Sequence, residues 1–222
     1  TASEEVKKIL AGARSEVRKE AMSGLGKIYL HLDASGSMSS MFEEATRLAA
    51  ILAECVNEPQ DNFKWGIFGE AGIELPLPQE FVQDAFSQIL YQRTAGRGMT
   101  NVVALYDRAR KFGAEYDVYI TDQGHNTSDL GKVLSNYHRM NPTIAKPKAI
   151  LIIDVQQATN LVQVGFESIG VPVTVVRPEV LKGSSSVVQT LRKAIEGPMA
   201  ILNEIMEIDL PKYPKWWYTI EL

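Results

Sequence analysis

Residues 28–37, Ile-Tyr-Leu-His-Leu-Asp-Ala-Ser-Gly-Ser, join an apolar run to a segment with helical spacing. The first five residues predict a buried strand that ends at Asp33. Beyond them, apolar residues recur at helical spacing from Met41 to Val56, so we expect a long amphipathic helix over about 38–57. The connection must turn sharply, and we expect Gly36 to provide the conformational freedom for this turn.

The same connection carries one carboxylate and two hydroxyls at the carboxyl end of a strand. Asp33, Ser35 and Ser37 are oxygen ligands of the kind that Mg²⁺ prefers, so the stretch is a candidate metal site. The alternative is that Ser35, Ser37 or Ser39 merely caps the following helix. These residues alone do not decide between the two interpretations.

The rest of the chain alternates apolar strand-like runs with helical patterns, which is typical of a parallel sheet covered on both faces. Phe63 to Gly69 and Ile73 to Leu75 predict a short antiparallel hairpin at a sheet edge. We therefore expect an open, doubly wound, mostly parallel α/β sheet with one antiparallel edge strand, a Rossmann-like fold. The further expected strands are 118–121, 149–153 and 171–176, and the further expected helices lie near 81–89, 101–113, 130–137, 160–169 and 184–195.

Three parts of the chain are distinguished by their patterns. Residues 1–23 predict an amphipathic helix packed on the body, residues 24–196 the α/β domain, and residues 197–222 a C-terminal extension. Trp216, Trp217 and Tyr218 in the extension are expected to dock onto apolar surface of the domain, because exposed aromatic patches are rare on monomers. The alternative is a tail that binds a partner.

Composition excludes several classes of protein. The net charge of −4 and the pI near 5.5 argue against a general affinity for nucleic acid or for an anionic membrane surface. The single cysteine, Cys55, excludes an internal disulfide. No run approaches the roughly 20 apolar residues of a membrane span, and the charged N-terminal residues are unlike a signal peptide. We expect a soluble cytoplasmic protein.

Two carboxylates are expected to meet at one point of the sheet. Open α/β sheets bind ligands at the carboxyl ends of strands where the strand order reverses. In the strand order 3-2-1-4-5-6, the strand ending at Asp33 neighbours the strand ending at Asp122. The glycine-rich loop 94–101, which carries Thr100, leads into the helix before the second of these strands, so it can lie over the same crevice.

These three segments together resemble the metal-ion-dependent adhesion site of the von Willebrand factor type A domain. The resemblance covers roughly residues 25–196, and the ordered triplet of motifs is far more specific than any one of them. It implies that a divalent ion, Mg²⁺ or Mn²⁺, is bound by five residues: Asp33, Ser35, Ser37, Thr100 and Asp122.

Within that family, the order and spacing of Tyr119 to Asp122, the helix from Leu130 to Arg139 and the run from Lys146 to Leu151 are similar to the C-terminal domain of the Ro ribonucleoprotein autoantigens. Those proteins bind RNA mainly with a helical-repeat ring that precedes this domain. A Ro-type ribonucleoprotein component is therefore one alternative function. We expect no direct nucleic-acid binding by this chain alone.

An enzyme is the other alternative, because phosphatases of the haloacid-dehalogenase type also use a strand-end Asp with Mg²⁺. Such an enzyme needs a second Asp two residues after the first, where this chain has Ser35. The chain also has no nucleophile elbow and no Walker-type phosphate loop. We therefore expect a protein that is not an enzyme.

The expected ligands do not complete the shell of the ion. Two carboxylates and three hydroxyls leave a Mg²⁺ ion with an open position toward solvent, and the natural ligand for that position is an acidic side chain. The sequence therefore predicts a metal-dependent protein-interaction module whose ion is completed by an Asp or Glu of a partner protein.

Overall fold

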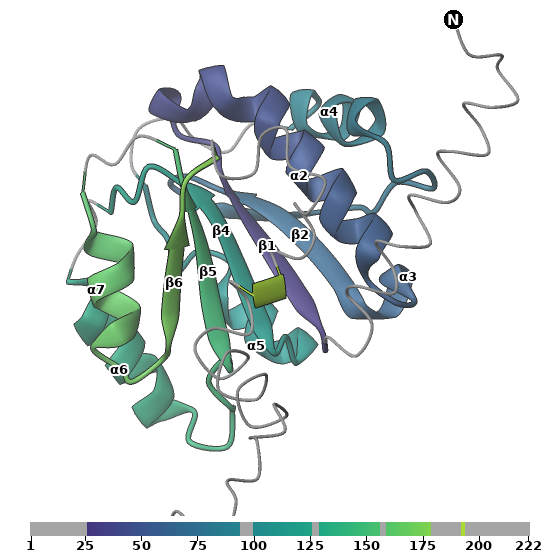
Figure 1. Cartoon of the computed structure of the whole chain (residues 1–222). Coiled ribbons are helices and arrows are strands. Elements are labelled where there is room, and N and C mark those ends of the chain that lie inside the picture. Colours follow the sequence, from purple (N-terminus) through teal and green to yellow (C-terminus); the bar gives the residue numbers. More distant parts are fainter. Residues whose placement is uncertain (1–25, 94–99, 126–128, 156–158, 179–191, 194–222) are drawn as a thin grey trace, which may run out of the picture.

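The computed structural model describes residues 26–93, 100–125, 129–155, 159–178 and 192–193. Within them the chain alternates strands and helices around one sheet (Figure 1). The strands are β1 (Ile28–Asp33), β2 (Phe63–Phe68), β3 (Gly72–Leu75), β4 (Tyr116–Thr121), β5 (Ala149–Asp154) and β6 (Val173–Val176). The helices are the 3₁₀ helix η1 (Gly36–Met41), α2 (Phe42–Cys55), α3 (Pro59–Asn62), α4 (Gln83–Tyr91), α5 (Tyr106–Phe112), α6 (Leu130–Met140) and α7 (Leu161–Glu167).

The six strands lie in the order β3-β2-β1-β4-β5-β6. Only the β2–β3 pair is antiparallel, and β1 pairs in parallel with both β2 and β4. This confirms the predicted Rossmann-like α/β sheet, including the antiparallel edge strand and the contact between the strands that end near Asp33 and Asp122.

Each face of the sheet has its own core, because side chains alternate along a strand. Leu30 and Leu32 of β1 join a cluster that includes Leu48 and Leu52 of α2 and Phe86 of α4. The opposite face carries a second cluster, to which α5, α6 and α7 contribute. Helices thus cover both faces, as Figure 1 shows for α2 and α4 on one side.

Several element boundaries differ from the sequence expectation. The helix expected over 38–57 divides into η1 and α2, and the short helix α3 was not predicted. The helix expected over 101–113 begins only at Tyr106, because residues 102–105 form turns. The expected helix near 184–195, the N-terminal helix 1–23 and the extension 197–222 lie outside the described residues, apart from residues 192–193.

The expectation that the turn after β1 needs the conformational freedom of Gly36 is wrong. Its φ angle is not in the left-handed region, and a Cβ placed on it would meet no atom within 4 Å. The turn after β1 therefore does not need a glycine at this position. No helix among the described residues is long and apolar enough to cross a membrane.

Candidate metal centre

The carboxyl ends of β1 and β4 place Asp33 beside Thr121. The two strands run parallel with Leu32 opposite Ile120, so their last residues reach the same edge of the sheet. Thr121 Oγ1 donates a hydrogen bond to Asp33 Oδ2 at 2.8 Å, and both residues are fully buried. The predicted convergence of these two strand ends is therefore present.

The loop after β1 brings its serines to the same edge. The backbone amide of Ser35 donates to Asp33 Oδ1 at 2.8 Å, which folds the loop back over the strand end. Ser35 Oγ lies 3.1 Å from Ser37 Oγ, and Ser37 Oγ donates to Asp122 Oδ2 at 2.6 Å. Four of the five predicted ligands thus form a continuous chain of hydrogen bonds.

The position of Thr100 follows from a hydrogen bond of Asn101, the next residue in the chain. The amide of Asn101 donates to the carbonyl of Gly69 at 2.8 Å, and Gly69 directly follows β2. The amide of Ala34 donates to Phe68 at the end of the same strand, also at 2.8 Å. Thr100 is buried, and the bond of Asn101 places this part of the chain near the carboxyl end of β2, while residues 94–99 are outside the described residues.

The capping alternative does not account for the serine hydroxyls. Ser35 is the N-cap of η1, yet its side chain makes no capping hydrogen bond, and the N-cap of α2 is Met41. Ser39 Oγ donates to the carbonyl of Gly36 at 3.0 Å, so it satisfies an acceptor and caps no amide. The hydroxyls of Ser35 and Ser37 are engaged instead with each other and with Asp122.

Burial and charge make this edge unfavourable for an unpaired carboxylate. Burial raises the pKa of Asp33, and the negative charge of Asp122 adds to this effect, while hydrogen bonds from Ser35 and Thr121 oppose it. Asp33 is fully buried, Asp122 is half-buried and Ser37 is exposed. The cluster of oxygens therefore runs from the protein interior to solvent, and a cation there would offset the repulsion between the two carboxylates.

The residues present fit a small hard cation. Octahedral ligands at about 2.0–2.1 Å from Mg²⁺ stand roughly 2.9 Å from their neighbours. The hydrogen-bonded oxygens of Ser35 and Ser37, 3.1 Å apart, and of Ser37 and Asp122, 2.6 Å apart, are close enough to one another to be ligands of the same ion. Across the described ranges, no group of three or more His, Cys, Asp or Glu side chains forms an alternative metal cluster.

Gln123 supports the site, although no sequence pattern singles it out. Its φ of 61° is left-handed, which is uncommon for a residue other than glycine. Its amide donates to Thr121 Oγ1 at 3.0 Å, and its Nε2 donates to Asp154 Oδ2 at 2.6 Å. Gln123 thereby fixes the turn that presents Asp122. Asp154, at the end of β5, holds the side chain of Gln123 in place and is itself buried.

Comparison with known proteins adds little to this geometry. No family model matches the chain, and no curated protein matches it. Among solved structures, the crystal structure of the Ro (RSR) protein of Deinococcus radiodurans is similar with a TM-score of 0.44 and 14% identity. That alignment covers 59% of this chain but only 27% of the Ro protein. A likeness at this level carries no argument about function, so the α/β Rossmann-like assignment rests on the order and direction of the six strands.

Proposed function

We propose that this chain is a protein-interaction module that binds Mg²⁺ or Mn²⁺ and uses the ion to hold an acidic residue of a partner protein. The ion would be held by Asp33, Ser35, Ser37, Thr100 and Asp122. The observation that supports this most directly is that Ser37 Oγ lies within hydrogen-bond distance of both Ser35 Oγ and Asp122 Oδ2, so that oxygens from two different loops meet at one point.

The exposure of the site favours a partner over a purely structural ion. Ser37 faces solvent and Asp122 is only half-buried, so one side of the oxygen cluster is accessible. Because Mg²⁺ readily retains water ligands, a carboxylate from outside can replace one of them.

The surroundings give little support to the phosphatase alternative. The position two residues after Asp33 is Ser35, whose amide donates to the Asp33 carboxylate. His125, the histidine nearest to Asp122 in the sequence, is buried and its Nδ1 accepts from the amide of Val102 at 3.4 Å. His125 therefore holds two loops together, and this arrangement does not resemble a general base that faces a substrate.

Calorimetric titration with Mg²⁺ and with Mn²⁺ tests the ion site. Binding should be measurable for the wild-type chain and lost in Asp122→Ala, which removes a charged ligand from the exposed side. Ser39→Ala is the matched control, because its hydroxyl lies on the same turn outside the ligand set. Equal affinities in wild type and Asp122→Ala would contradict the proposed site.

The role of the ion in recognition needs a second measurement. Proteins captured from the source lysate by the immobilised chain should be bound in Mg²⁺ and released by EDTA, and Asp33→Ala should not capture them. A captured partner should then lose binding when its own acidic residue is replaced by Ala. Capture that is the same in all samples would show that recognition uses another surface.

A further inference from the structure

All four polar groups of the buried residue Gln123 are hydrogen-bonded, and their partners come from the ends of β4 and β5 and from the start of α7. The backbone amide donates to Thr121 Oγ1 at 3.0 Å, and Nε2 donates to Asp154 Oδ2 at 2.6 Å. Oε1 accepts from the amide of Gln163 at 3.3 Å, and the backbone carbonyl accepts from Thr159 Oγ1 at 3.4 Å. Because a carboxylate accepts and a backbone amide donates, only one orientation of the Gln123 side-chain amide satisfies both partners.

The bond from Gln123 to Thr121 leads directly to the candidate metal centre. Thr121 Oγ1 accepts from the Gln123 amide, so its own hydrogen is free to donate to Asp33 Oδ2, which lies 2.8 Å away. With the left-handed backbone of Gln123, the amide of Gly124 faces back along the chain and donates to Asp122 Oδ1 at 3.0 Å. The conformation of Gln123 therefore bears on both carboxylates of the proposed ion site.

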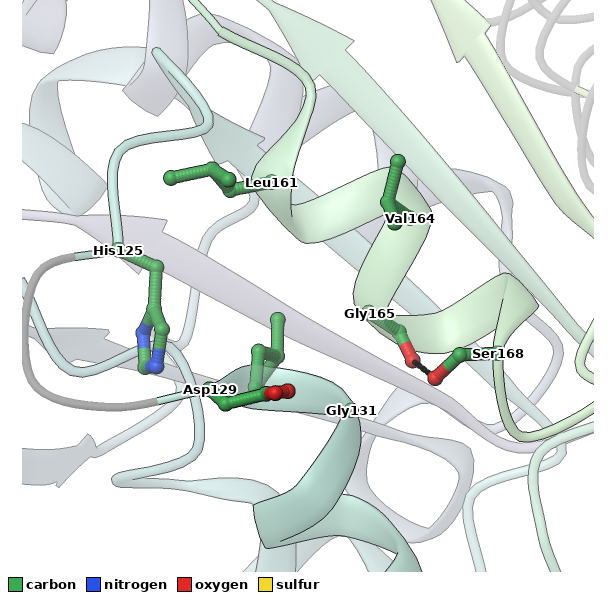
Figure 2. Close-up of a pocket in the computed structure, with 8 residues that line it drawn as sticks. His125, Asp129, Gly131, Leu161, Val164, Gly165 and Ser168 are labelled. Atoms are coloured by element: carbon green, nitrogen blue, oxygen red, sulfur yellow. Dashed lines mark hydrogen bonds between the residues drawn. The ribbon is translucent and has the colours of Figure 1, made fainter.

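The other end of Gln123 is bonded to the first turn of α7, residues 161–164. Figure 2 shows Leu161 at the start of this turn and His125 in the loop after β4, and the two residues line one hollow. Thr159 Oγ1 accepts from the amide of Leu161 at 3.1 Å and donates to the carbonyl of Gln123, so this hydroxyl connects the turn to Gln123. The contacts of Gln123 with Thr159 and Gln163 are longer than its other two bonds, so we expect them to open first in a local fluctuation.

We propose that Gln123 is a positioning residue that couples ion binding to closure of the first turn of α7. This inference rests on the proposed function and specifies how the same site is regulated. The turn has two states: it is closed when both of its bonds to Gln123 are made, and locally open when they are broken. The closed turn holds Gln123, and Gln123 holds Thr121 and the loop of Asp122 in the arrangement that binds the ion. Closure therefore raises the ion affinity, and by linkage ion binding favours closure by the same factor.

Variants at residue 123 separate the role of its backbone from that of its side chain. Gln123→Gly keeps the left-handed backbone, which glycine adopts readily, and removes the bonds to Asp154 and to the Gln163 amide. The double variant Gln123→Glu, Asp154→Asn keeps the total charge and inverts the bond, because the new amide at position 154 donates to the new carboxylate at position 123. The second oxygen of that carboxylate can still accept from the amide of Gln163. Gln163→Ala is the matched control, because it removes an exposed side-chain bond to Glu167 and keeps the backbone amide.

The test is amide hydrogen exchange of the full chain, measured residue by residue without ion and in saturating Mg²⁺. Calorimetric titration of the same samples shows whether the ion is bound. In wild type and in Gln163→Ala, Mg²⁺ should slow exchange of the amides of residues 161 and 163 by roughly 5- to 150-fold, the usual range of coupling between two sites. The amide of Phe86 in α4, which packs on the opposite face of the sheet from α7, is the internal reference for general stabilisation.

In Gln123→Gly the same two amides should exchange faster than in wild type even without ion, and Mg²⁺ should slow them no more than it slows the amide of Phe86. The inverted pair should restore the slowing by Mg²⁺. If Gln123→Gly does not bind the ion, the inverted pair decides the question, and ion binding by that pair without slowing in α7 would overturn the coupling.

Two further results would count against the inference. Wild type that binds Mg²⁺ without slowing the amides of residues 161 and 163 beyond that of Phe86, or equal slowing in wild type and Gln123→Gly, would overturn the coupling and leave the metal function standing. A wild-type chain that binds neither Mg²⁺ nor Mn²⁺ would overturn the proposed function and this inference together.

Discussion

Arg110 donates from Nη2 to both carboxylate oxygens of Asp117, at 2.6 and 2.7 Å, with both side chains almost completely buried beneath α5. Arg110 Nη1 also donates to the carbonyl of Ala114 at 2.8 Å. The pair therefore connects the end of α5 to the start of β4, the strand that presents Thr121 and Asp122.

Replacing Asp117 by Ala should destabilise the protein by about 3–5 kcal/mol, because it leaves the Arg110 guanidinium buried without a counter-charge. Urea unfolding measures this change. The double variant Arg110→Met, Asp117→Leu should recover much of the lost stability, since it removes both charges and keeps apolar volume. A loss below about 1 kcal/mol in Asp117→Ala would show that water reaches the pair.

The contribution of His31 to stability should fall as the pH drops below about 6.5. Burial lowers the pKa of His31, Arg110 lowers it further, and the nearby carboxylate of Asp117, 3.6 Å away, opposes both. The unfolded chain therefore binds a proton at a higher pH than the folded chain does. The contribution of neutral His31 to the free energy of unfolding is fully present above the pKa that His31 has in the unfolded chain. It is lost as the pH falls toward the lower pKa that His31 has in the folded protein.

The expected loss from this group between pH 7.5 and 5.5 is up to about 1.4 kcal/mol, measured by urea unfolding at both values. His31→Phe should show a smaller loss while keeping the stacking of this side chain on Tyr119, whose ring lies 4.2 Å away. The lowered pKa of His138 adds a contribution of the same sign in both proteins, so it cancels in the comparison. Identical pH dependence in the two proteins would refute this assignment.

Thr121→Val should weaken metal binding although Thr121 is not among the proposed ligands. The hydroxyl donates to Asp33 and helps to lower the pKa of that carboxyl, so its loss should raise this pKa further. Protonated Asp33 binds a cation poorly, and the metal affinity should therefore fall at a higher pH than in wild type. Titrations with Mn²⁺ from pH 7 to 5 measure the shift.

Thr46→Val is the control for this experiment. Thr46 is also fully buried and hydrogen-bonded, to the carbonyls of Phe42 and Glu43 in α2, but it lies away from the strand ends. It should lose stability by a comparable amount, about 1–3 kcal/mol, with no change in how metal binding depends on pH. Equal shifts in the two variants would assign the effect to general destabilisation.

Two glycines should respond differently to substitution by Ala. A Cβ on Gly66 in β2 would lie 2.6 Å from the backbone oxygen of Ile73, so Gly66→Ala should cost about 1–3 kcal/mol. Gly36→Ala should stay within about 0.5 kcal/mol of wild type, because its surroundings are open. Thermal and urea unfolding of both variants give the comparison, and a large loss in Gly36→Ala would mean that the loop after β1 needs glycine.

The sequence was sufficient to predict the sheet because apolar runs and their lengths carry that information. Asp33 and Asp122 could be placed together because each directly follows such a run, and parallel neighbours end at one edge. Binding of an ion there stays a prediction. The charged pair of Arg110 and Asp117 was not predicted, since no local pattern shows that a helix residue and a strand residue will meet.

Gln123 shows a second limit of reasoning from sequence. Its left-handed backbone and its bonds to Thr121 and Asp154 depend on tertiary neighbours, and glutamine has no preference for this conformation. Gly36 shows the converse limit, because a glycine in a turn suggested a conformational need that the folded loop does not have. Residue type indicates which conformations are possible, and packing decides which of them is used.

The central place of β1 has a consequence for synthesis of the protein. Its two neighbours in the sheet are β2, which ends at Phe68, and β4, which ends at Thr121. A ribosome adding about 5–20 residues per second needs roughly 3–10 s to pass from the first of these positions to the second. During that interval one edge of β1, whose six residues are all buried in the folded protein, has no native neighbour, and such an edge can pair with other chains. The nascent protein should therefore be open to such pairing through β1 while residues 69–121 are being made.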